Sequence, residues 1–295
     1  MKSTVKKTLS LATLILTAIV WGVAFVAQRQ GSESIGAFTL LSSRSFIAVA
    51  ALLPVIGIRS LFGGKKSSHS SRKTLWVGGI LCGIALATAS ALQQIGINYT
   101  TAGKAGFITA LYIVIVPIIA VFFKKRASLF VWIGVVLATA GMYFLCMDSG
   151  FSVSKGDMFV FGCAFCFSVQ IMLVDHFAPK VDGVKLACVQ FFVCGAVCVL
   201  PALILEQPTV QVFKDAMFPI LYLGLISSGV GYTLQIVAQK HVQPALASLV
   251  MSLESVFAVL SGWLILDETL SQREIIGCVL MFAAILLAQI KLKKE

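Results

Sequence analysis

The order of apolar and polar residues along the chain predicts a bundle of membrane-spanning helices. Ten apolar runs are bounded by charged or turn-forming residues, and a helix needs about 20 apolar residues to cross the hydrocarbon core. The predicted spans are residues 9–28, 37–57, 74–97, 103–122, 128–147, 156–175, 183–203, 216–238, 244–265 and 272–291. The first run follows basic residues but is too long for the apolar part of a signal peptide and lacks a cleavage site, so we interpret it as a retained helix.

Composition supports this interpretation. Of the 295 residues, 59% are hydrophobic and only 12% are charged, and the mean hydropathy is +0.98. A soluble protein cannot bury that much apolar surface. A transmembrane β-barrel would show alternating segments of about 10 residues, which the sequence lacks. The sequence therefore predicts an all-α polytopic membrane protein.

The basic residues predict the orientation of the chain. If the N-terminus is cytoplasmic, 17 of the 23 Lys and Arg residues lie on the cytoplasmic side and five lie on the other side. Such a bias places both termini in the cytoplasm. It also explains the net charge of +11 without a nucleic-acid partner. We expect a multi-pass protein of the plasma or inner membrane.

One stretch of the chain occurs twice. Residues 92–117 read LQQIGINYTTAGKAGFITALYIVIVP, and residues 234–259 read LQIVAQKHVQPALASLVMSLESVFAV. Gln93 matches Gln235 at a spacing of 142 residues. Two apolar runs joined by a short polar turn, repeated once, indicate two homologous halves.

The repeat also predicts how the halves are related. With five spans in each half, corresponding helices run in opposite directions, so the halves are inverted about an axis in the membrane plane. We predict ten transmembrane helices as two inverted five-helix repeats, residues 1–149 and 150–295. The spacing of 142 residues places Tyr112 opposite Glu254.

Several short motifs occur in order along the chain. They are Val20-Trp21-Gly22, Arg44, Asn98-Tyr99-Thr100-Thr101-Ala102-Gly103, Leu253-Glu254 and Asp267-Glu268. Together they resemble the EamA family of the drug/metabolite transporter superfamily over essentially the whole chain. The resemblance implies a ten-helix secondary carrier, often an exporter of amino acids or other small metabolites. It also implies a central cavity lined by spans one to four and six to nine, with spans five and ten outside.

The chain departs from the family pattern in two places. Ser255 stands where the family commonly has a proline after Leu-Glu, so the sequence gives no reason to expect a kink in the ninth span. Lys124-Lys125-Arg126 stands where the first half of the family often has an acidic turn.

Glu254 is the first candidate for a functional residue. It lies ten residues into the ninth span, or ~15 Å along the helix, which is near the middle of the bilayer. A carboxyl group at that depth must face a cavity, find a partner or stay protonated. It is either a site for proton coupling or for a substrate ammonium group, or a structural carboxyl that joins helices.

Arg44 is the other charged candidate. It lies seven residues into the second span, or ~10 Å from the outer face. Three interpretations remain open: a salt bridge with Glu254, binding of a substrate carboxylate, or a side chain that extends outward to water. In the repeat, Arg44 matches Gln190 at a spacing of 146 residues.

Five uncharged residues complete the candidates. Amides deep in a span either join helices or line the pathway, and the repeat favours the pathway for Gln93 and Gln235. Trp21, Tyr112 and Tyr232 either line the cavity or pack in the core.

Catalysis and cofactors are not expected. Gly103-Lys104 lacks the rest of a phosphate-binding loop, and no His-Glu-x-x-His motif occurs. The eight cysteines lie in or at the ends of apolar runs, so we interpret them, including Cys163-x-x-Cys166, as structural. The sequence predicts no enzyme, no cofactor and no metal site.

The sequence therefore predicts a secondary transporter that works by alternating access. It would export a small metabolite or an amino acid, with proton coupling as one option. The alternatives are an uncoupled facilitator, a nucleotide-sugar-like carrier and, from a different class, a lipid-handling or scaffold membrane protein. The expected partners are a small-molecule substrate and the lipid bilayer, and the chain acts as a monomer or a homodimer.

Overall fold

The structure, a computed structural model, describes residues 2–62, 71–99, 102–125, 127–146, 154–266 and 271–288. Helices occupy most of these ranges, which contain no strand, so the all-α prediction is confirmed. Four motif residues, Thr100, Thr101, Asp267 and Glu268, lie outside the described ranges. The first half contains α1 (Lys2–Ser32), α2 (Ala37–Phe62), α3 (Arg72–Ile97), α4 (Ala102–Ala110), α5 (Tyr112–Phe122) and α6 (Leu129–Cys146).

The second half contains more and shorter segments. They are α7 (Lys155–Phe177), η1 (Ala178–Lys180), α8 (Gly183–Pro201), η2 (Ala202–Glu206), α9 (Val210–Asp215), α10 (Met217–Leu221), η3 (Tyr222–Tyr232), α11 (Thr233–Gln239), α12 (Pro244–Met251), α13 (Glu254–Leu266) and α14 (Gln272–Ala288). The segments η2 and η3 are π-helical, and they continue α8 and α10 without leaving the helical path.

Eight helical segments within the described ranges are long and apolar enough to cross a membrane. The fifth predicted span corresponds to a shorter apolar helix, Leu129–Phe144. The tenth corresponds to α14, which has 17 residues, and the rest of that predicted span lies outside the described residues. The polytopic membrane architecture is therefore confirmed, whereas the count of ten spans stays a prediction.

The distribution of side chains is the reverse of that in a soluble protein. Large apolar residues such as Leu53, Val136 and Leu286 are exposed around the bundle, while glutamines and even Arg44 and Glu254 are buried. Apolar side chains on the outside match hydrocarbon, and polar groups inside find one another. This arrangement is what contact with lipid requires.

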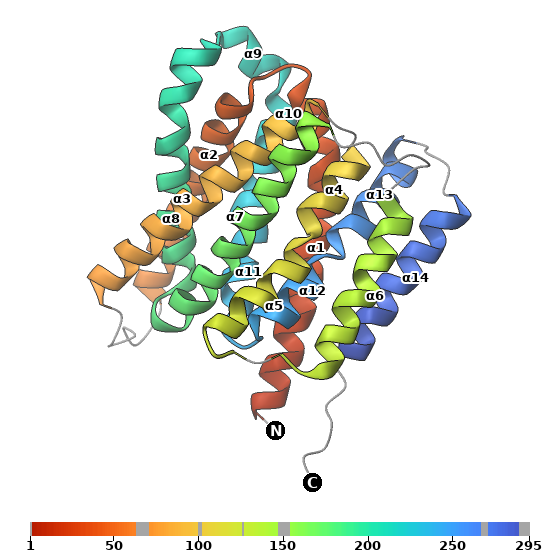
Figure 1. The fold of residues 1–295 in the computed structure, drawn as a ribbon. Helices are drawn as coiled ribbons and strands as arrows, with labels where there is room; N and C mark the ends of the chain where they lie inside the picture. The colour runs from red at the N-terminus through yellow and green to blue at the C-terminus, as the bar shows by residue number, and fades with distance from the viewer. Residues whose placement is uncertain are drawn as a thin grey trace.

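The helices pack with an internal symmetry. α6 packs along α14, α2 along α8, and α5 against α12, and each of these pairs joins corresponding spans of the two halves. Similarly, the contact of α3 with α7 has its counterpart in the contact of α1 with η3 and α11. In Figure 1, α6 and α14 form one side of the bundle, and α1 runs through the middle. This pattern supports the predicted repeat.

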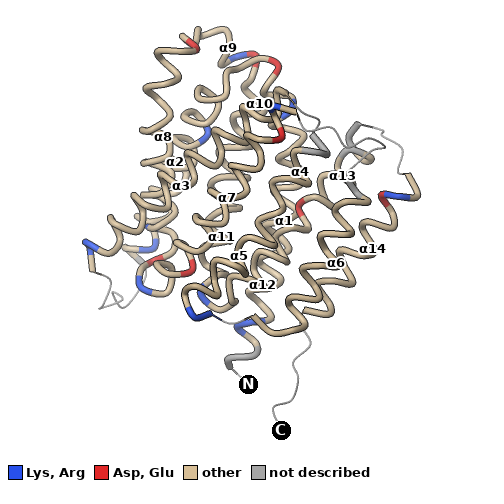
Figure 2. The backbone as a smooth tube through the Cα atoms, in the orientation of Figure 1, with Lys and Arg blue, Asp and Glu red and all other residues tan. Residues whose placement is uncertain are grey.

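Charged residues gather at the two ends of the bundle (Figure 2). Lys and Arg are more numerous at the end where α1 begins and α14 ends. The start of α1, the end of α14 and most basic residues therefore share one end of the bundle, and the orientation of that end in the membrane stays a prediction.

The ninth predicted span is broken, contrary to the expectation from the missing proline. α12 ends at Met251 and α13 begins at Glu254. The hydroxyl of Ser252 donates to the Leu249 carbonyl oxygen at 2.8 Å, which competes with the backbone ladder and bends helices. The backbone N–H groups of Leu253 and Ser255 then bond to carbonyls three residues back, at 3.3 and 3.2 Å. The ninth span is therefore interrupted without a proline at the break.

Glycines allow helices to approach closely at two contacts. A Cβ on Gly22 would lie 2.4 Å from Phe257 Cβ and 2.7 Å from its backbone carbon, so α1 and α13 touch there backbone to backbone. On α3, a Cβ on Gly83 would lie 2.7 Å from the Gln190 carbonyl oxygen in α8. Small residues at such contacts let helix backbones approach closely in membrane proteins.

A carboxylate from the second half caps α2. Glu206 accepts hydrogen bonds from the backbone N–H groups of Phe38 and Thr39 at 2.9 and 2.8 Å, and from the Thr39 hydroxyl at 2.6 Å. Gly36 leaves room for it, because a Cβ there would lie 2.2 Å from Glu206 Cδ. Negative charge at a helix N-terminus is stabilising, so Glu206 holds the start of α2 against η2.

The Gly22 contact yields a paired prediction. Gly22→Ala should lower the free energy of unfolding by about 1–3 kcal/mol, because an added methyl group has no space at a tight contact. Gly57→Ala is the matched control, since a Cβ there meets nothing within 4 Å, and alanine should stabilise α2 by up to about 1 kcal/mol. Thermal unfolding of both variants in detergent measures the difference. Equal effects would show that α1 and α13 do not make this contact.

Removal of the Glu206 cap should also be measurable. Glu206→Ala leaves three donors at the start of α2 without their acceptor, which costs about 1–2 kcal/mol. Glu33→Ala is the control because Glu33 is exposed at the same end of the bundle. A melting temperature that drops for Glu33→Ala as much as for Glu206→Ala would contradict the cap.

Candidate functional site

All seven residues that the sequence singles out line one cavity between the halves of the bundle. The lining consists of Trp21, Ala24, Phe25, Gln28, Arg44, Gln93, Thr109, Tyr112, Phe167, Gln170, Ile171, Ser227, Tyr232, Gln235 and Glu254. Their position in one cavity is a structural result, whereas their roles in binding or coupling stay predictions.

The lining comes from both halves but not from every expected span. The first half contributes from α1, α2, α3, α4 and α5, and the second half contributes from α7, η3, α11 and α13. α6 and α14 contribute none of these residues, as expected for spans five and ten. The expectation is wrong for span seven: α8 supplies no lining residue. Its Gln190 lies behind the wall, where it accepts a hydrogen bond from Gln170.

Tyr112 and Glu254 are joined by a hydrogen bond. The Tyr112 hydroxyl donates to Glu254 Oε1 at 2.9 Å, and 142 positions separate the two residues. Both side chains are at least nine-tenths buried. Each residue is also the first of its helical segment, α5 or α13. Residues that the repeat alignment pairs therefore contact each other, which occurs only close to a symmetry axis.

Arg44 and Glu254 share the cavity without pairing. Within the described residues, neither of the ion pairs formed, Arg59–Asp182 and Lys125–Asp175, includes Arg44 or Glu254. The salt bridge that the sequence allowed is therefore absent from this conformation, because Glu254 bonds to Tyr112 instead. The Nε atom of Arg44 is buried and has no hydrogen-bond partner, and the residue as a whole is 5% exposed. The third interpretation, an Arg44 that extends outward to water, is also wrong.

The glutamines form short chains of hydrogen bonds. Gln235 Nε2 donates to Gln170 Oε1 at 3.4 Å, and Gln170 Nε2 donates to Gln190 Oε1 at 3.1 Å. Gln93 Nε2 donates to the Thr109 hydroxyl at 3.1 Å. The amides therefore join helices and line the cavity, while their place on a transport pathway stays a prediction. Gln235 Oε1 keeps a free acceptor there.

Aromatic rings form one wall of the cavity. The rings of Trp21 and Tyr232 are 4.6 Å apart, and Tyr232 meets Phe191 edge-on at 5.5 Å. Trp21 Nε1 donates to the Ser227 carbonyl oxygen at 3.4 Å. Ser227 and Tyr232 lie in the π-helical segment η3, and π-helical turns often occur at functional sites.

Sequence reasoning missed Gln28, Thr109 and Ser227 as lining residues. Each is a polar residue in an apolar run, and that pattern can indicate a lining residue. The pattern is ambiguous for serine and threonine, because their hydroxyl groups can hydrogen-bond to the backbone of their own helix. Ser227 contributes mainly its carbonyl, and a backbone group leaves no trace in the sequence.

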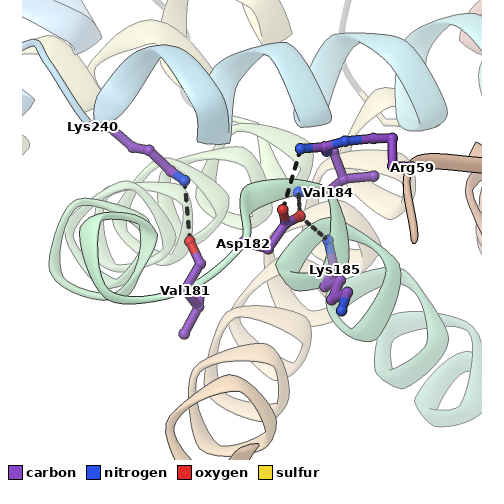
Figure 3. A network of polar contacts seen from close by, with 6 residues as sticks. All are labelled: Arg59, Val181, Asp182, Val184, Lys185 and Lys240. Atoms are coloured by element: carbon purple, nitrogen blue, oxygen red, sulfur yellow. Dashed lines mark hydrogen bonds and ion pairs between the residues drawn. The ribbon is translucent and has the colours of Figure 1, made fainter. Parts of the chain in front are cut away.

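A second group of polar contacts joins the ends of α2, α8 and α11 (Figure 3). Asp182 caps α8 through Val184 and Lys185, at 2.9 and 3.1 Å, and Arg59 at the end of α2 bonds to its other oxygen at 3.3 Å. Lys240, just after α11, donates to the Val181 carbonyl oxygen at 3.0 Å. Burial lowers the pKa of Lys240, and the Asp182 carboxylate acts in the opposite direction. The network ties both halves together at this end.

The cavity lining offers charged and polar groups that can bind a small polar molecule. One guanidinium, one carboxyl, several amides and four hydroxyl-bearing side chains surround it. Among the described residues, no group of three or more His, Cys, Asp or Glu side chains could hold a metal ion. Water-sized molecules can occupy about 40 Å³ of the cavity, which is room for a few waters.

Comparison with known proteins identifies the family. The model of the EamA-like transporter family matches residues 8–147 and 154–289. The chain belongs to the EamA-like transporter family. The resemblance seen in the sequence is therefore confirmed, and with it the assignment to the drug/metabolite transporter superfamily.

Individual relatives of this EamA-like transporter agree with the assignment. An uncharacterized transporter of Archaeoglobus fulgidus is 29% identical over 286 residues, 94% of this chain and 85% of the relative. The uncharacterized transporter YoaV of Bacillus subtilis is 19% identical over 92% of this chain and 94% of its own length. The threonine/homoserine exporter RhtA of Escherichia coli K12 is 26% identical over 188 residues, 60% of each chain.

A solved crystal structure shares the fold. It superposes with a TM-score of 0.79 over 95% of this chain and 98% of its own, at 18% sequence identity. At that identity the likeness concerns the fold alone.

The Tyr112–Glu254 hydrogen bond predicts an energetic coupling. In a double-mutant cycle of Tyr112→Phe and Glu254→Gln, thermal unfolding should reveal a coupling of about 0.5 kcal/mol or more, because the residues touch. Tyr99→Phe is the control partner, since Tyr99 is 61% exposed, and should show no coupling to Glu254→Gln. Equal coupling of both tyrosines would contradict the contact.

Proposed function

We propose that this protein is a secondary transporter that exports a small metabolite or amino acid by alternating access, with Glu254 coupling transport to protons. The observation that carries the proposal is the Tyr112–Glu254 hydrogen bond inside a polar cavity between two matching halves. A carboxyl held at this depth is costly unless it has a task or a partner, and its single tyrosine partner leaves it able to exchange a proton.

The helix breaks support alternating access. α4–α5 and α12–α13 are interrupted at corresponding positions, with Tyr112 and Glu254 at the start of the second segments. Broken helices at the centre of two repeats are typical of carriers in which one half rocks on the other. The narrow cavity fits this scheme, because a substrate of amino-acid size needs its walls to move apart. We propose that the repeats are residues 1–149 and 150–295, with ten spans.

The charge bias and the family support a proposed location and direction of transport. We propose a plasma or inner membrane location with both termini in the cytoplasm, since the basic end of the bundle then faces the cytoplasm. Export of an amino acid is supported by the named activity of RhtA, a threonine/homoserine exporter, which aligns with part of this chain.

Two alternatives are less well supported. A lipid-handling protein would need an apolar opening toward the bilayer, whereas charged and amide side chains line this cavity. A nucleotide-sugar-like carrier would need the cavity walls to move apart much farther than an amino acid requires, because the cavity of this conformation admits only a few waters.

Transport into proteoliposomes tests the proposal. The purified protein should take up members of a radiolabelled metabolite panel that includes L-threonine and L-homoserine, and a pH gradient should drive that uptake. Uptake no greater than in empty liposomes, for every member of the panel, would refute the transporter function.

Proton coupling is tested separately. Glu254→Gln should abolish the response to the pH gradient, because an amide does not take up or release a proton, while Glu33→Gln at the bundle surface should leave the response intact. If Glu254→Gln retains the response, Glu254 does not couple transport. Uptake by the unaltered protein that ignores the gradient would instead identify an uncoupled facilitator.

A further inference from the structure

Basic side chains gather where α2 ends and where α3 and α8 begin. Arg59 lies in the last turn of α2, Arg72 and Lys73 are the first residues of α3, and Lys185 lies in the first turn of α8. All four are exposed. Asp182 caps the start of α8. In these three helix ends four cations therefore accompany one carboxylate, and the excess charge is positive.

Glycine contacts place the start of α3 level with the start of α8. A Cβ on Gly79 would lie 2.3 Å from Val189 Cγ1, and a Cβ on Gly83 would lie 2.7 Å from Val193 Cβ. Both contacts join residues 110 positions apart, so the two helices run in the same direction at close range. The same spacing puts Arg72 level with the residue just before α8. The cations of α3 and α8 therefore lie at one depth in the bundle.

The carboxylate of Asp182 is already engaged by the protein. Its Oδ1 accepts from the backbone N–H groups of Val184 and Lys185 at 2.9 and 3.1 Å, and its Oδ2 accepts from Arg59 Nη2 at 3.3 Å (Figure 3). A guanidinium has five N–H donors, so Arg59 keeps donors for another anion. Among the described residues, no hydrogen bond or ion pair reaches Lys185 Nζ. Both cations are therefore available to a ligand.

The cations adjoin apolar surface of the kind that faces lipid. Ile58 precedes Arg59 and is 58% exposed. Trp76 and Ile80, one and two turns beyond Lys73 on α3, are 44% and 41% exposed. Tryptophan is enriched where headgroups meet hydrocarbon. The basic groups therefore lie at the depth of phospholipid headgroups, and the apolar residues lie at the depth of the acyl chains.

We propose that this cluster binds the headgroup of an anionic phospholipid, with the phosphate between Arg59 and Lys185. The planar fork of an arginine pairs with two phosphate oxygens, and a lysine supplies a point charge. Basic pockets between transmembrane helices bind anionic headgroups in this way. Arg72 and Lys73 add attraction at longer range. A free phosphate ion has the same charged group but gains nothing from the apolar residues beside the cluster.

The bound headgroup joins the two halves of the protein. Arg59 belongs to α2 in the first half and Lys185 to α8 in the second half, and these two helices pack along each other. A phosphate that contacts both cations adds a link beside the one through Asp182. A ligand that binds only the folded protein raises its stability, so an anionic lipid should raise the melting temperature.

The test titrates the full-length protein in detergent with dioleoyl phosphatidylglycerol or dioleoyl phosphatidylcholine, which differ in headgroup charge but not in acyl chains. Native mass spectrometry counts the bound lipid, and thermal unfolding is measured on the same samples. We expect phosphatidylglycerol to bind on the order of 10-fold more tightly than phosphatidylcholine, and to raise the melting temperature further. Glycerol 3-phosphate, which lacks the acyl chains, should do neither at the same concentration.

Variants locate the site. Arg59→Gln and Lys185→Gln should each weaken the binding of phosphatidylglycerol about fivefold and leave that of phosphatidylcholine unchanged, whereas Lys185→Arg should retain it. Lys214→Gln is the matched control, because Lys214 is an exposed lysine on α9, beyond the far end of α8. If Arg59→Gln does not fold, Lys185→Gln still decides, since Lys185 Nζ has no partner to lose among the described residues.

Three results would overturn the proposal. The first is equal affinity for the two lipids, and the second is unchanged binding of phosphatidylglycerol in the folded variants of the cluster. An equal loss in Lys214→Gln would show a response to net charge rather than to a site. Glycerol 3-phosphate that stabilises the protein as much as phosphatidylglycerol would assign the cluster to a soluble anion instead of a lipid. Transport is not measured here, so failure of this inference leaves the proposed function intact.

Discussion

Polar groups of a membrane-spanning helix cannot hydrogen-bond to water, and this constraint determines where the polar side chains of this protein lie. Hydrocarbon neither donates nor accepts hydrogen bonds, so a deep carboxyl, a guanidinium and several amides must face one another or a cavity. The Tyr112–Glu254 hydrogen bond and the chain from Gln235 to Gln190 are the result. The apolar side chains, in turn, cover the outside of the bundle.

Symmetry decides where those polar groups meet. The two halves present corresponding helices to each other, so residues near the axis pair with their own counterparts, as Tyr112 does with Glu254. The two halves have the same arrangement of helices but different side chains at corresponding positions. A tyrosine faces a glutamate, and an arginine in the cavity wall corresponds to a glutamine behind it. Because the helices are related by a twofold axis while the side chains of the two halves differ, the cavity can distinguish the two ends of a ligand.

Several of the helices that form the cavity have local irregularities. α12 and α13 are separated by a short turn, η3 is π-helical, and α1 meets α13 through Gly22. In contrast, α6 and α14 are uninterrupted and pack on each other at the side of the bundle. Irregular backbone at the centre and regular helices at the periphery suit a carrier whose cavity must change shape while its frame stays intact.

Hydropathy, charge bias and the internal repeat determined much of this protein from sequence alone. Lipid contact imposes long apolar runs, and depth along a helix follows from counting residues, so the class of fold and the candidates near the bilayer centre could be derived. Side-chain partners could not, because they depend on helix rotation and on which helices are neighbours. Only the tertiary structure paired Glu254 with Tyr112 rather than with Arg44, moved α8 out of the cavity wall, and broke the ninth span without a proline. The sequence does not indicate which serine hydroxyls bond to the backbone of their own helix. The interruption of the helix is therefore visible only in the folded structure.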